Sequence, residues 1–373
     1  MKILMVTNQV KTYALGFKNV IEPLQQLGHQ VLWAANFSDF IGSISSIPCD
    51  IIQIPISSNP FNLANIQAYR ELLSTIRSKG VEGVYCSTPI GGTLGRLAAK
   101  VGGVSPVVYA AHGFLFFKGV PMIKRLLFWM HEALLAHWTD TLITITTEDY
   151  LAAKKMQLRT KGLPNYIHGA GVEVNKSVKV DRKSKRTELG VPLDSFVLVS
   201  AGSLNKNKNN RVVIRSLTRL TSEVHYLVCG EGKEAKELEA LTRKCKCNQR
   251  VKFLGFREDI AEIMSISDAF ILPSRREGIP RALLEAMDLG LPCIASRIRG
   301  ITDLISDGKG GFLCKPNSIS EITRAVNMLK NDPLLRRSMG EYNKRTVYDY
   351  SDSVVRSELY CLFKAVFNAG HDK

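Results

Sequence analysis

The sequence predicts an α/β protein built from two doubly wound domains, each a parallel β-sheet with helices on both faces. Its 373 residues exceed the usual size of a single domain. Short apolar runs that are typical of buried strands alternate with longer amphipathic stretches, as in a parallel sheet with helical crossovers. The alternation breaks off once, at a charged segment with few apolar residues, and then resumes. Such sheets bind ligands at the carboxyl ends of their strands, so we expect two crevices that face each other across a cleft.

The apolar runs are the most definite local feature of the sequence. In the first half they are Ile3–Val6, Val31–Ala35, Ile51–Ile56, Val81–Cys86, Val107–Ala111 and Leu142–Ile145. In the second half they are Phe196–Ala201, Val224–Cys229, Val251–Phe256, Ala269–Leu272, Cys293–Ala295 and Gly311–Cys314. The charged segment Asn175–Glu188 is the best candidate for an interdomain linker. We therefore predict a first domain over residues 1–175, a linker over 176–188, a second domain over 189–345, and a helical segment over 346–373 that packs back toward the first domain.

The chain is strongly basic, with a formal net charge of +16 that both halves share. This charge indicates an anionic partner, which can be nucleic acid, anionic lipid or a phosphorylated small molecule. Apart from the short run Asp181–Arg186, the chain lacks arginine-rich tracts and interleaved aromatic residues, so we set nucleic acid aside. The hydrophobic and charged contents, 45% and 23%, are typical of a soluble globular protein.

The cysteines and the start of the chain indicate a cytoplasmic protein. Most of the eight cysteines stand singly inside apolar strands, where they act as small buried hydrophobes in a reducing compartment. Met1-Lys2 leads at once into a strand-like run, which leaves no room for a signal peptide. No apolar run reaches the length of a membrane span.

The glycine pattern argues against a nicotinamide enzyme. No Gly-x-Gly-x-x-Gly follows the first strand. The later run Gly91-Gly92-Thr93-Leu94-Gly95 lacks the dinucleotide spacing, and we interpret it as a helix start with close backbone packing.

The stretch Ile271–Gly290 is the one around which we expect the function to be organised. It predicts the end of a buried strand, a polar loop, and a helix that begins at Pro280. Glu277 precedes the helix and Glu285 lies within it, and at about 100° per residue this spacing brings them nearly to one side. Between them, free N–H groups at the helix start can seat a phosphate. The alternative is that Glu277 only complements the helix dipole and that Glu285 is a solvated helix residue.

The loop Ser200–Asn209 is a second candidate phosphate site. It follows a strand, its Gly202 lets a ligand approach the backbone, and Lys206 and Lys208 supply point charges. Ordinary solvated loop lysines are the alternative.

In the first half, His112 ends a buried strand, where a crevice residue is expected, and Gly113 follows it. The alternative is a core histidine whose ring is hydrogen-bonded. The apolar stretch Val120–Trp138 then predicts either a helix that lies in a membrane interface or a helix packed into the core. The basic and aromatic residues that favour the interface are Lys118, Lys124, Arg125 and Trp129.

Several of these motifs together resemble the family 4 retaining glycosyltransferases, which have the GT-B fold. The central match is Pro273-Ser274, the two glutamates, and Glu285-Ala286-Met287-x-x-Gly290-x-Pro292. The Gly-x-Leu…Lys-Asn loop after Ala201 is also similar. Further matches are the glycine turn at Gly230, the turn Phe253–Arg257, and the segments Gly300–Ile305 and Asp307–Leu313. Tyr109–Gly119 resembles a subgroup that acts in bacterial exopolysaccharide and capsule synthesis.

The resemblance implies a role for each matched position. Glu277 would orient the hydroxyls of the donor sugar, Glu285 would bind ribose, and Lys208 would contact the donor phosphates. His112 would position the sugar from the opposite domain. The implied catalytic residues are Glu277, His112 and Lys208. The implied donor-binding residues are Gly202, Lys206, Lys208, Gly230, Phe256, Arg257, Ser274, Arg275, Gly278, Ile279, Pro280 and Glu285.

The chain also departs from the family pattern. Ser203 stands where many relatives have arginine, so Lys206 or Arg275 would have to supply that charge. Glu231 replaces the usual aspartate. The histidines that relatives often carry at the positions of Ser87 and Leu115 are missing, as is the glycine-rich loop over Asn8–Gly16.

We therefore predict a retaining glycosyltransferase that moves a sugar from a nucleotide sugar, most simply a UDP-sugar, to a lipid-linked saccharide in surface polysaccharide assembly. No Asp-x-Asp pair is placed to hold a metal, so we predict metal-independent catalysis without a cofactor. The lipid-linked acceptor and the basic surface together suggest that the protein contacts an anionic membrane. A sugar-nucleotide epimerase, a non-catalytic nucleotide-sugar binding protein and a nucleic-acid binder are the alternatives.

Overall fold

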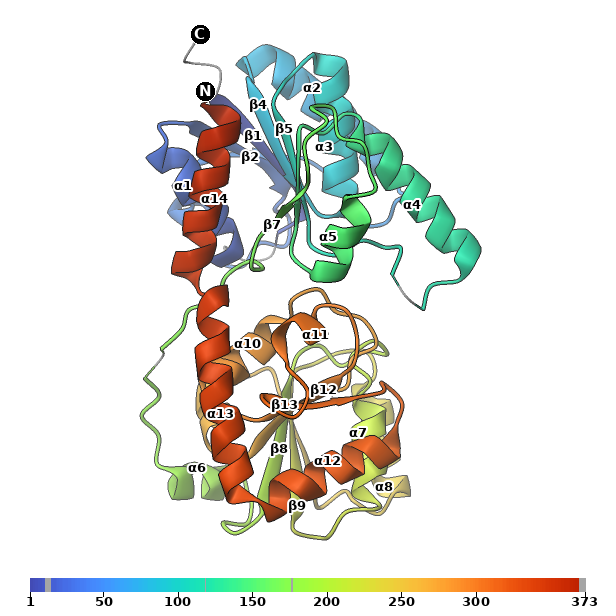
Figure 1. The fold of residues 1–373 in the computed structure, drawn as a ribbon, viewed down its shortest axis with the longest axis vertical. Coiled ribbons are helices and arrows are strands. Elements are labelled where there is room, and N and C mark those ends of the chain that lie inside the picture. The colour runs from blue at the N-terminus through green and yellow to red at the C-terminus, as the bar shows by residue number, and fades with distance from the viewer. Residues whose placement is uncertain (11–14, 118, 176, 369–373) are drawn as a thin grey trace. The chain divides into compact units, whose positions relative to one another are not determined.

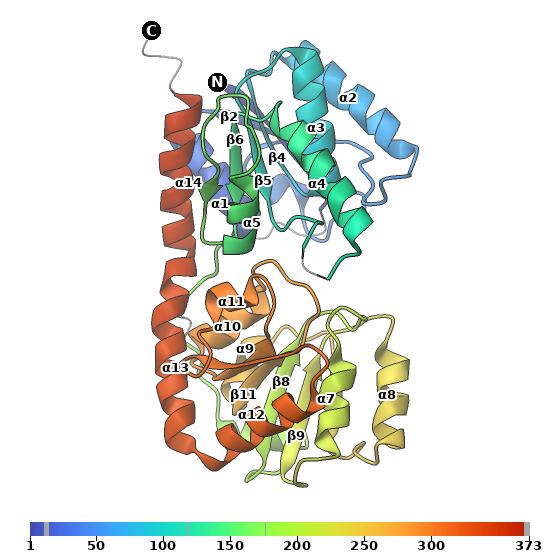
Figure 2. The ribbon, with the colours of Figure 1, turned by 45° about the vertical axis from the view of Figure 1, so that its right-hand side comes forward.

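The computed structural model describes residues 1–10, 15–117, 119–175 and 177–368. The chain forms two compact units. Unit 1 comprises Met1–Gly171 together with the residues from Asp352 onward, and unit 2 comprises Val172–Ser351. Figure 1 shows the elements of each unit, and Figure 2 shows the same ribbon turned by 45° about the vertical axis.

Unit 1 is built on a parallel sheet whose seven described strands have the order β3-β2-β1-β4-β5-β6-β7. The strands are β1 (Lys2–Gln9), β2 (Gln30–Asn36), β3 (Asp50–Gln53), β4 (Gly83–Ser87), β5 (Val107–Ala111), β6 (Thr141–Thr144) and β7 (Asn165–Tyr166). The helices are α1 (Leu15–Gln26), α2 (Ala64–Lys79), α3 (Pro89–Gly102), α4 (Met122–Ala136), α5 (Thr147–Ala153) and α14 (Asp352–Phe367), with a 3₁₀ turn at Ile44–Ser46.

Both faces of this sheet are covered, so the unit has two apolar layers. Ala68 and Leu72 of α2 and Ala98 of α3 pack on one face. Helices α1 and α14 pack on the other, with Leu359 and Phe363 among the buried side chains. The start of α3 lies so close to the sheet that a Cβ at Gly92 would be 2.3 Å from the ring of Tyr109. This contact agrees with the close backbone packing predicted for the glycine run.

Unit 2 repeats the plan with six described strands in the order β10-β9-β8-β11-β12-β13, again all parallel. The strands are β8 (Phe196–Ala201), β9 (Val224–Cys229), β10 (Val251–Gly255), β11 (Ala269–Leu272), β12 (Cys293–Ser296) and β13 (Gly311–Cys314). The helices are α6 (Arg182–Glu188), α7 (Asn210–Leu217), α8 (Ala235–Lys244), α9 (Ile260–Ser265), α10 (Arg281–Asp288), α11 (Ile301–Leu304), α12 (Ile319–Asn331) and α13 (Pro333–Val347), with a 3₁₀ turn at Tyr348–Tyr350.

In each sheet the chain starts at the centre, runs to one edge, and then returns to build the other half. The reversal lies between β1 and β4 in unit 1 and between β8 and β11 in unit 2. At such a point the loops that follow the two central strands diverge, which leaves a crevice at the carboxyl ends of the strands. The topology therefore places the loops after β8 and β11 at the binding crevice of unit 2.

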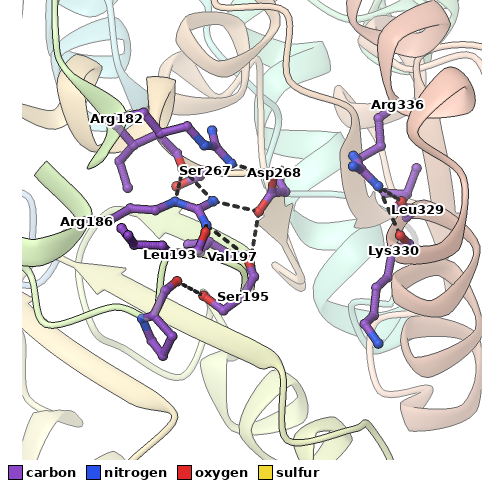
Figure 3. Close-up of polar contacts among 12 residues, drawn as sticks. Arg182, Arg186, Leu193, Ser195, Val197, Ser267, Asp268, Leu329, Lys330 and Arg336 are labelled. Atoms are coloured by element: carbon purple, nitrogen blue, oxygen red, sulfur yellow. Dashed lines mark hydrogen bonds and ion pairs between the residues drawn. The ribbon is translucent and has the colours of Figure 1, made fainter. Parts of the chain in front are cut away.

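The segment predicted to be a linker, 176–188, is in part an integral piece of unit 2, so that prediction was wrong for α6. Figure 3 shows Arg186 of this helix in the interior, where its guanidinium donates to the carbonyl oxygens of Leu193 and Ser195. The same guanidinium bonds Asp268 at 2.9 Å. Burial lowers the pKa of Arg186, and the carboxylate of Asp268 opposes that shift. A buried arginine needs partners of this kind, so α6 cannot detach from the unit at low cost.

Polar side chains form hydrogen bonds with backbone groups on the outer side of the edge strand β13. The N–H of Leu313 donates to Asp307 Oδ1 at 2.9 Å, and the guanidinium of Arg297 donates to the carbonyl oxygen of Leu313 at 3.1 Å. Arg297 and Asp307 also bond each other at 2.6 Å. Side chains of its own unit thus occupy the hydrogen-bonding groups of this edge.

Candidate functional site

Two loops of unit 2 meet at the reversal point of its sheet. The first follows β8 and the second follows β11, and both contain residues that the sequence singled out. Their closest polar contact joins Lys208 Nζ to Glu277 Oε1 at 2.7 Å. The lysine side chain is 21% exposed and the glutamate side chain 12%. Two residues that are 69 positions apart in sequence therefore form one partly buried ion pair.

Backbone contacts hold the two loops in this register. The N–H of Arg275 donates to the carbonyl oxygen of Asn207 at 2.8 Å, and the side-chain amide of Asn207 donates to the carbonyl oxygen of Arg276 at 2.9 Å. Asn209 is buried, has a left-handed φ of 57°, and donates to the carbonyl oxygen of Pro273 at 3.1 Å. No binding role was predicted for these asparagines. Their signal was present, because asparagine in a loop just before a helix tolerates left-handed backbone and bonds main-chain groups.

Glycines allow the neighbouring loops to approach by their backbones. Gly230 follows β9 with a φ of 131°, and a Cβ there would be 2.0 Å from the carbonyl oxygen of Gly202. Gly300 follows β12 with a φ of 75°, and a Cβ there would be 1.6 Å from the carbonyl oxygen of Gly278. Any side chain at either position would separate the loops.

Helix α10 begins one residue later than predicted. Pro280 is its N-cap in extended conformation, and Arg281 is the first helical residue. Glu277 therefore lies in the loop, so helical periodicity does not relate it to Glu285, and that part of the prediction was wrong. Glu285 is on the helix, where its carboxylate is 3.7 Å from Arg281. The N–H of Leu283 bonds the carbonyl oxygen of Pro280 at 3.1 Å, so the N–H groups of Arg281 and Ala282 at the helix start are the ones suited to an anion.

Ser274 is an unusual part of the β11 loop. It is 0% exposed, yet its hydroxyl oxygen has no hydrogen-bond partner among the residues that the structure describes. Buried hydroxyls nearly always have a partner, and exceptions concentrate at functional positions. Gly278 and Ile279 in the same loop are half-buried.

The predicted auxiliary cations lie at the rim. Lys206 and Arg275 are both exposed, and the guanidinium of Arg275 lies 3.4 Å from Asn209 Oδ1. Ser203, at the position where relatives carry arginine, is also exposed and accepts a bond from Asn205 at 2.8 Å. Arg275 thus lies against the lysine loop, and Lys206 is exposed on that loop.

The turn after β10 presents one aromatic and one basic side chain. Phe256 is 74% exposed. Arg257 is paired with Asp259, to which its Nε donates at 2.7 Å, and with Glu188 at 3.3 Å. Lys185 of α6 bonds the same aspartate at 2.6 Å. The hydrogen bond from Arg257, reinforced by the one from Lys185 against the opposing effect of burial, lowers the pKa of Asp259.

Replacement of this aspartate should produce a pH-dependent loss of stability. A carboxylate whose pKa is lowered in the folded state stabilises the protein above its unfolded-state pKa of about 4, and the contribution disappears as the pH falls. We expect Asp259→Asn to reduce the free energy of unfolding by about 1–2 kcal/mol at pH 7. Urea unfolding at pH 7 and at about pH 2.5 checks this, because the contribution is lost below the unfolded-state pKa and the difference from the wild type should shrink there. A difference that does not change with pH would contradict it.

His112 lies at the end of β5 in unit 1, and its side chain is exposed. Desolvation by the surrounding protein nevertheless lowers the pKa of His112. Lys124 and Arg125 are exposed on α4, and Trp129 of the same helix is half-buried against the core. Lys118 lies outside the described residues.

Two further findings concern metals and membranes. In the described part of the chain, no group of three or more histidine, cysteine, aspartate or glutamate residues is arranged to hold a metal ion. None of the helices in the described ranges combines the length and apolar character needed to span a bilayer.

Comparisons with known proteins agree with this architecture. The family described as "Glycosyl transferases group 1" matches residues 181–346, and that described as "Glycosyl transferase 4-like" matches residues 2–147. The chain is 34% identical to EpsD of Bacillus subtilis (strain 168), a protein named as a glycosyltransferase, over 91% of this chain and 90% of EpsD. It is 29% identical to the UDP-Gal:alpha-D-GlcNAc-diphosphoundecaprenol alpha-1,3-galactosyltransferase of Escherichia coli, over 74% of this chain and 73% of that enzyme.

Among solved structures, Anabaena Alr3699/HepE in complex with UDP is similar over 98% of this chain and 100% of that chain, with a TM-score of 0.81 and 22% identity. Sucrose-phosphate synthase from Thermosynechococcus elongatus gives a TM-score of 0.83 at 16% identity, over 99% and 100% of the two chains. The two parallel-sheet units, the family matches over both of them and the near full-length likeness to EpsD lead to one conclusion: this protein belongs to the family 4 glycosyltransferases and has the GT-B fold.

Proposed function

We propose that this glycosyltransferase is a retaining enzyme that moves a sugar from a UDP-sugar to a lipid-linked saccharide during synthesis of a bacterial surface polysaccharide. The observation that carries the proposal is the Lys208–Glu277 contact at the reversal point of unit 2. A cation for a diphosphate and an acceptor for sugar hydroxyls stand side by side there, beside the amino end of α10.

The chemistry follows from the charge that develops when the bond between sugar and phosphate breaks. Negative charge grows on the departing diphosphate, and fixed dipoles and cations around it lower the barrier. Lys208, the first turn of α10 and Arg275 at the rim are suited to this role, and we propose that they act in place of a metal ion. Glu277 accepts hydrogen bonds from the sugar and stabilises positive character at the reacting carbon.

The donor class is inferred from the relatives and from the site. HepE was solved with UDP, and the similar Escherichia coli enzyme is named for a UDP-galactose donor. In this chain the buried hydroxyl of Ser274 is available to a donor oxygen, and Glu285 of α10 is half-buried and suited to accept bonds from a ribose. Phe256 offers an exposed ring near the expected base position.

The Glu285→Ala variant should mainly raise the KM for the donor, because a ribose contact is made equally in the ground state and the transition state. We expect a rise of roughly tenfold, the usual worth of a hydrogen bond to a charged group. Steady-state kinetics with varied donor at saturating acceptor measure it. An unchanged KM would count against ribose binding, and a fall in kcat alone would place Glu285 nearer the chemistry.

The proposed acceptor is lipid-linked, and α4 is the surface that we propose to contact the membrane. Of its 15 residues only Leu135 and Ala136 are buried, and Trp129 and Ala133 pack against the core of unit 1, so most of the helix lies at the surface. Figure 1 shows the helix projecting from the body of unit 1. One of its sides exposes Ile123 (76%), Leu127 (59%), Met130 (54%) and Leu134 (57%), and Lys124 and Arg125 are exposed near its start. An exposed apolar stripe with basic residues beside it suits an anionic bilayer surface at the cytoplasmic face.

We expect the Leu127→Asp variant to lose most of its binding to vesicles that contain phosphatidylglycerol, since it places a carboxylate in the apolar stripe. Vesicle co-sedimentation measures the loss. The matched control is Leu334→Asp, because Leu334 is 79% exposed and belongs to unit 2. Equal effects of the two variants would contradict a membrane role for α4.

The function itself is tested with the purified enzyme and a panel of nucleotide sugars, with and without a lipid-linked saccharide. Transfer that requires the acceptor and retains the anomeric configuration supports the proposal. If the enzyme converted one sugar nucleotide into another in the absence of acceptor, it would instead be an epimerase. Donor binding without turnover on any acceptor would identify a binding protein.

The role of His112 is tested in the same assay. Its exposed position after β5 suits a residue that contacts the donor sugar, so His112→Ala should lower kcat while UDP binding stays unchanged.

A further inference from the structure

Unit 1 contains a cavity of about 500 Å³ between α4 and α5 that no motif of the sequence predicted. Its volume is in the range of small-ligand sites. Both walls and the floor come from unit 1 alone. The lining residues are Phe116, Met122, Arg125, Leu126, Trp129, Glu148, Asp149, Leu151, Ala152 and Lys155.

The α4 wall of this groove is a different side of the helix from the exposed stripe. Met122, Leu126 and Trp129 follow the i, i+4, i+7 spacing of a single helical side, with Arg125 beside them. The stripe proposed for the bilayer is formed by Ile123, Leu127, Met130 and Leu134, none of which lines the groove. Helix α4 therefore presents one apolar side outward and a second to a concave site.

The floor of the groove is rigid and apolar. Phe116 is 6% exposed and stacks on Phe114 with ring centroids 4.6 Å apart. Across from α4, Leu151 and Ala152 of α5 complete the apolar lining. A hydrocarbon chain can therefore lie against these apolar side chains.

Two cations stand at the rim of the groove. Arg125 and Lys155 are exposed, and within the described residues neither side chain has an ion pair or side-chain hydrogen bond. The two acids that line the groove differ in burial and in their hydrogen bonds. Asp149 is 2% exposed and accepts a bond from the Thr146 hydroxyl at 2.8 Å at the start of α5, so it is engaged in the fold. Glu148 is half-buried, and its negative charge partly offsets the positive charges of Arg125 and Lys155.

We propose that this groove binds the lipid diphosphate end of the acceptor, with the first part of the hydrocarbon chain between α4 and α5 and the diphosphate at Arg125 and Lys155. The inference rests on the proposed function, because it assigns a site to the lipid-linked acceptor. It commits to a single lipid molecule and not to the bilayer, because the site is concave and combines an apolar lining with two cations that have no ion pair within the described residues.

The chain connects this groove to the sugar end of the reaction. Phe116 on its floor and His112 lie in the same loop after β5, four positions apart. Four residues span at most about 14 Å. An acceptor anchored by its lipid in the groove therefore holds its first saccharide units within reach of the loop that carries His112.

The test measures binding of farnesyl diphosphate to the full-length protein by calorimetry, with farnesol and inorganic pyrophosphate as partial ligands. Saturating UDP is present throughout, so that the diphosphate site of unit 2 is occupied. We expect farnesyl diphosphate to bind at least tenfold more tightly than farnesol or pyrophosphate, because only it meets both the apolar slot and the cations. Equal binding of farnesol would show a general apolar surface and overturn the proposal.

Two neighbouring residues of α4 give a matched pair of variants. Arg125→Ala should weaken farnesyl diphosphate binding by about tenfold and leave farnesol binding unchanged, since a charge-assisted contact is lost. Lys124→Ala, one position away and outside the groove, should have no effect. Both side chains are exposed, so both variants should fold. Equal effects of the two would mean that net charge alone attracts the ligand, and would overturn the proposal.

Filling the slot provides an independent check. Ala152→Phe should abolish farnesyl diphosphate binding, while Leu127→Asp, on the outward stripe, should not. Unchanged binding in Ala152→Phe would overturn the proposal. Binding of UDP and donor turnover are measured in parallel. A protein that binds farnesyl diphosphate in the groove but transfers no sugar would refute the proposed function alone, and one that transfers sugar with a groove indifferent to the lipid would refute this inference alone.

Discussion

The Glu277→Gln variant is expected to fold normally and to lose on the order of 10²–10³ in kcat, the range seen when one well-placed polar group at a reacting centre is removed. The amide keeps an oxygen that can accept from Lys208, now 2.7 Å from the glutamate, so the two loops should remain joined. What disappears is the negative charge that stabilises positive character on the sugar. Near-normal turnover in a donor-consumption assay would remove Glu277 from the mechanism.

The control for this variant is Glu239→Gln. Glu239 is an exposed acid on α8, where the same change of charge should leave kcat unaltered. Thermal unfolding of both variants separates loss of chemistry from loss of fold, because Glu277 is only 12% exposed and a structural cost would appear as a lower Tm.

The Lys208→Ala variant should lose both kcat and affinity for nucleoside diphosphate, by about 2–4 kcal/mol of transition-state stabilisation. The lysine charge acts on the diphosphate in the bound donor and acts more strongly as charge builds on the leaving group. Binding of UDP and of uridine, measured side by side, shows where the loss arises. UDP should weaken and uridine should not.

A lysine on the surface of the same unit serves for comparison. Lys236 is exposed on α8, so Lys236→Ala should bind UDP as the wild type does. If the wild-type protein bound uridine and UDP equally well, Lys208 would not be part of a diphosphate-binding site. Because Lys208 and Glu277 contact each other, the double variant should cost less than the sum of the two single variants.

The strands were the part of the fold that the sequence could predict best. Val107–Ala111, Phe196–Ala201, Val224–Cys229 and Ala269–Leu272 begin and end in the structure where the apolar runs do. A strand of a parallel sheet is covered on both faces, so its whole length is apolar and its limits are visible in one sequence. β7 escaped prediction because Asn165–Tyr166 is only two residues long and half-buried.

The linker was mispredicted for a physical reason. The charged composition of residues 182–188 is typical of a solvated segment, and nothing local shows that Arg186 has carbonyl partners 7 and 9 residues later and a carboxylate at Asp268. Burial of a charge depends on such distant partners. The first segment of unit 1 ends at Gly171, where residue 175 was predicted. Unit 2 ends at Ser351, where residue 345 was predicted.

For the site, the sequence could supply residues but not their contacts. The family and the fold were predicted from the motifs, and both are confirmed. The pairing of Lys208 with Glu277 was not predicted, because it depends on the order of β8 and β11 in the sheet. The groove between α4 and α5 was missed as well, since it depends on the direction of side chains on two helices.

The covered edge of β13 has a consequence for how this protein behaves at high concentration. An uncovered outer strand can recruit a strand of another molecule and so begin an aggregate. Arg297 and Asp307 occupy the positions that such a strand would need at Leu313. Growth of the sheet from one molecule into the next is therefore blocked at Leu313 by two side chains that bond the main chain and each other.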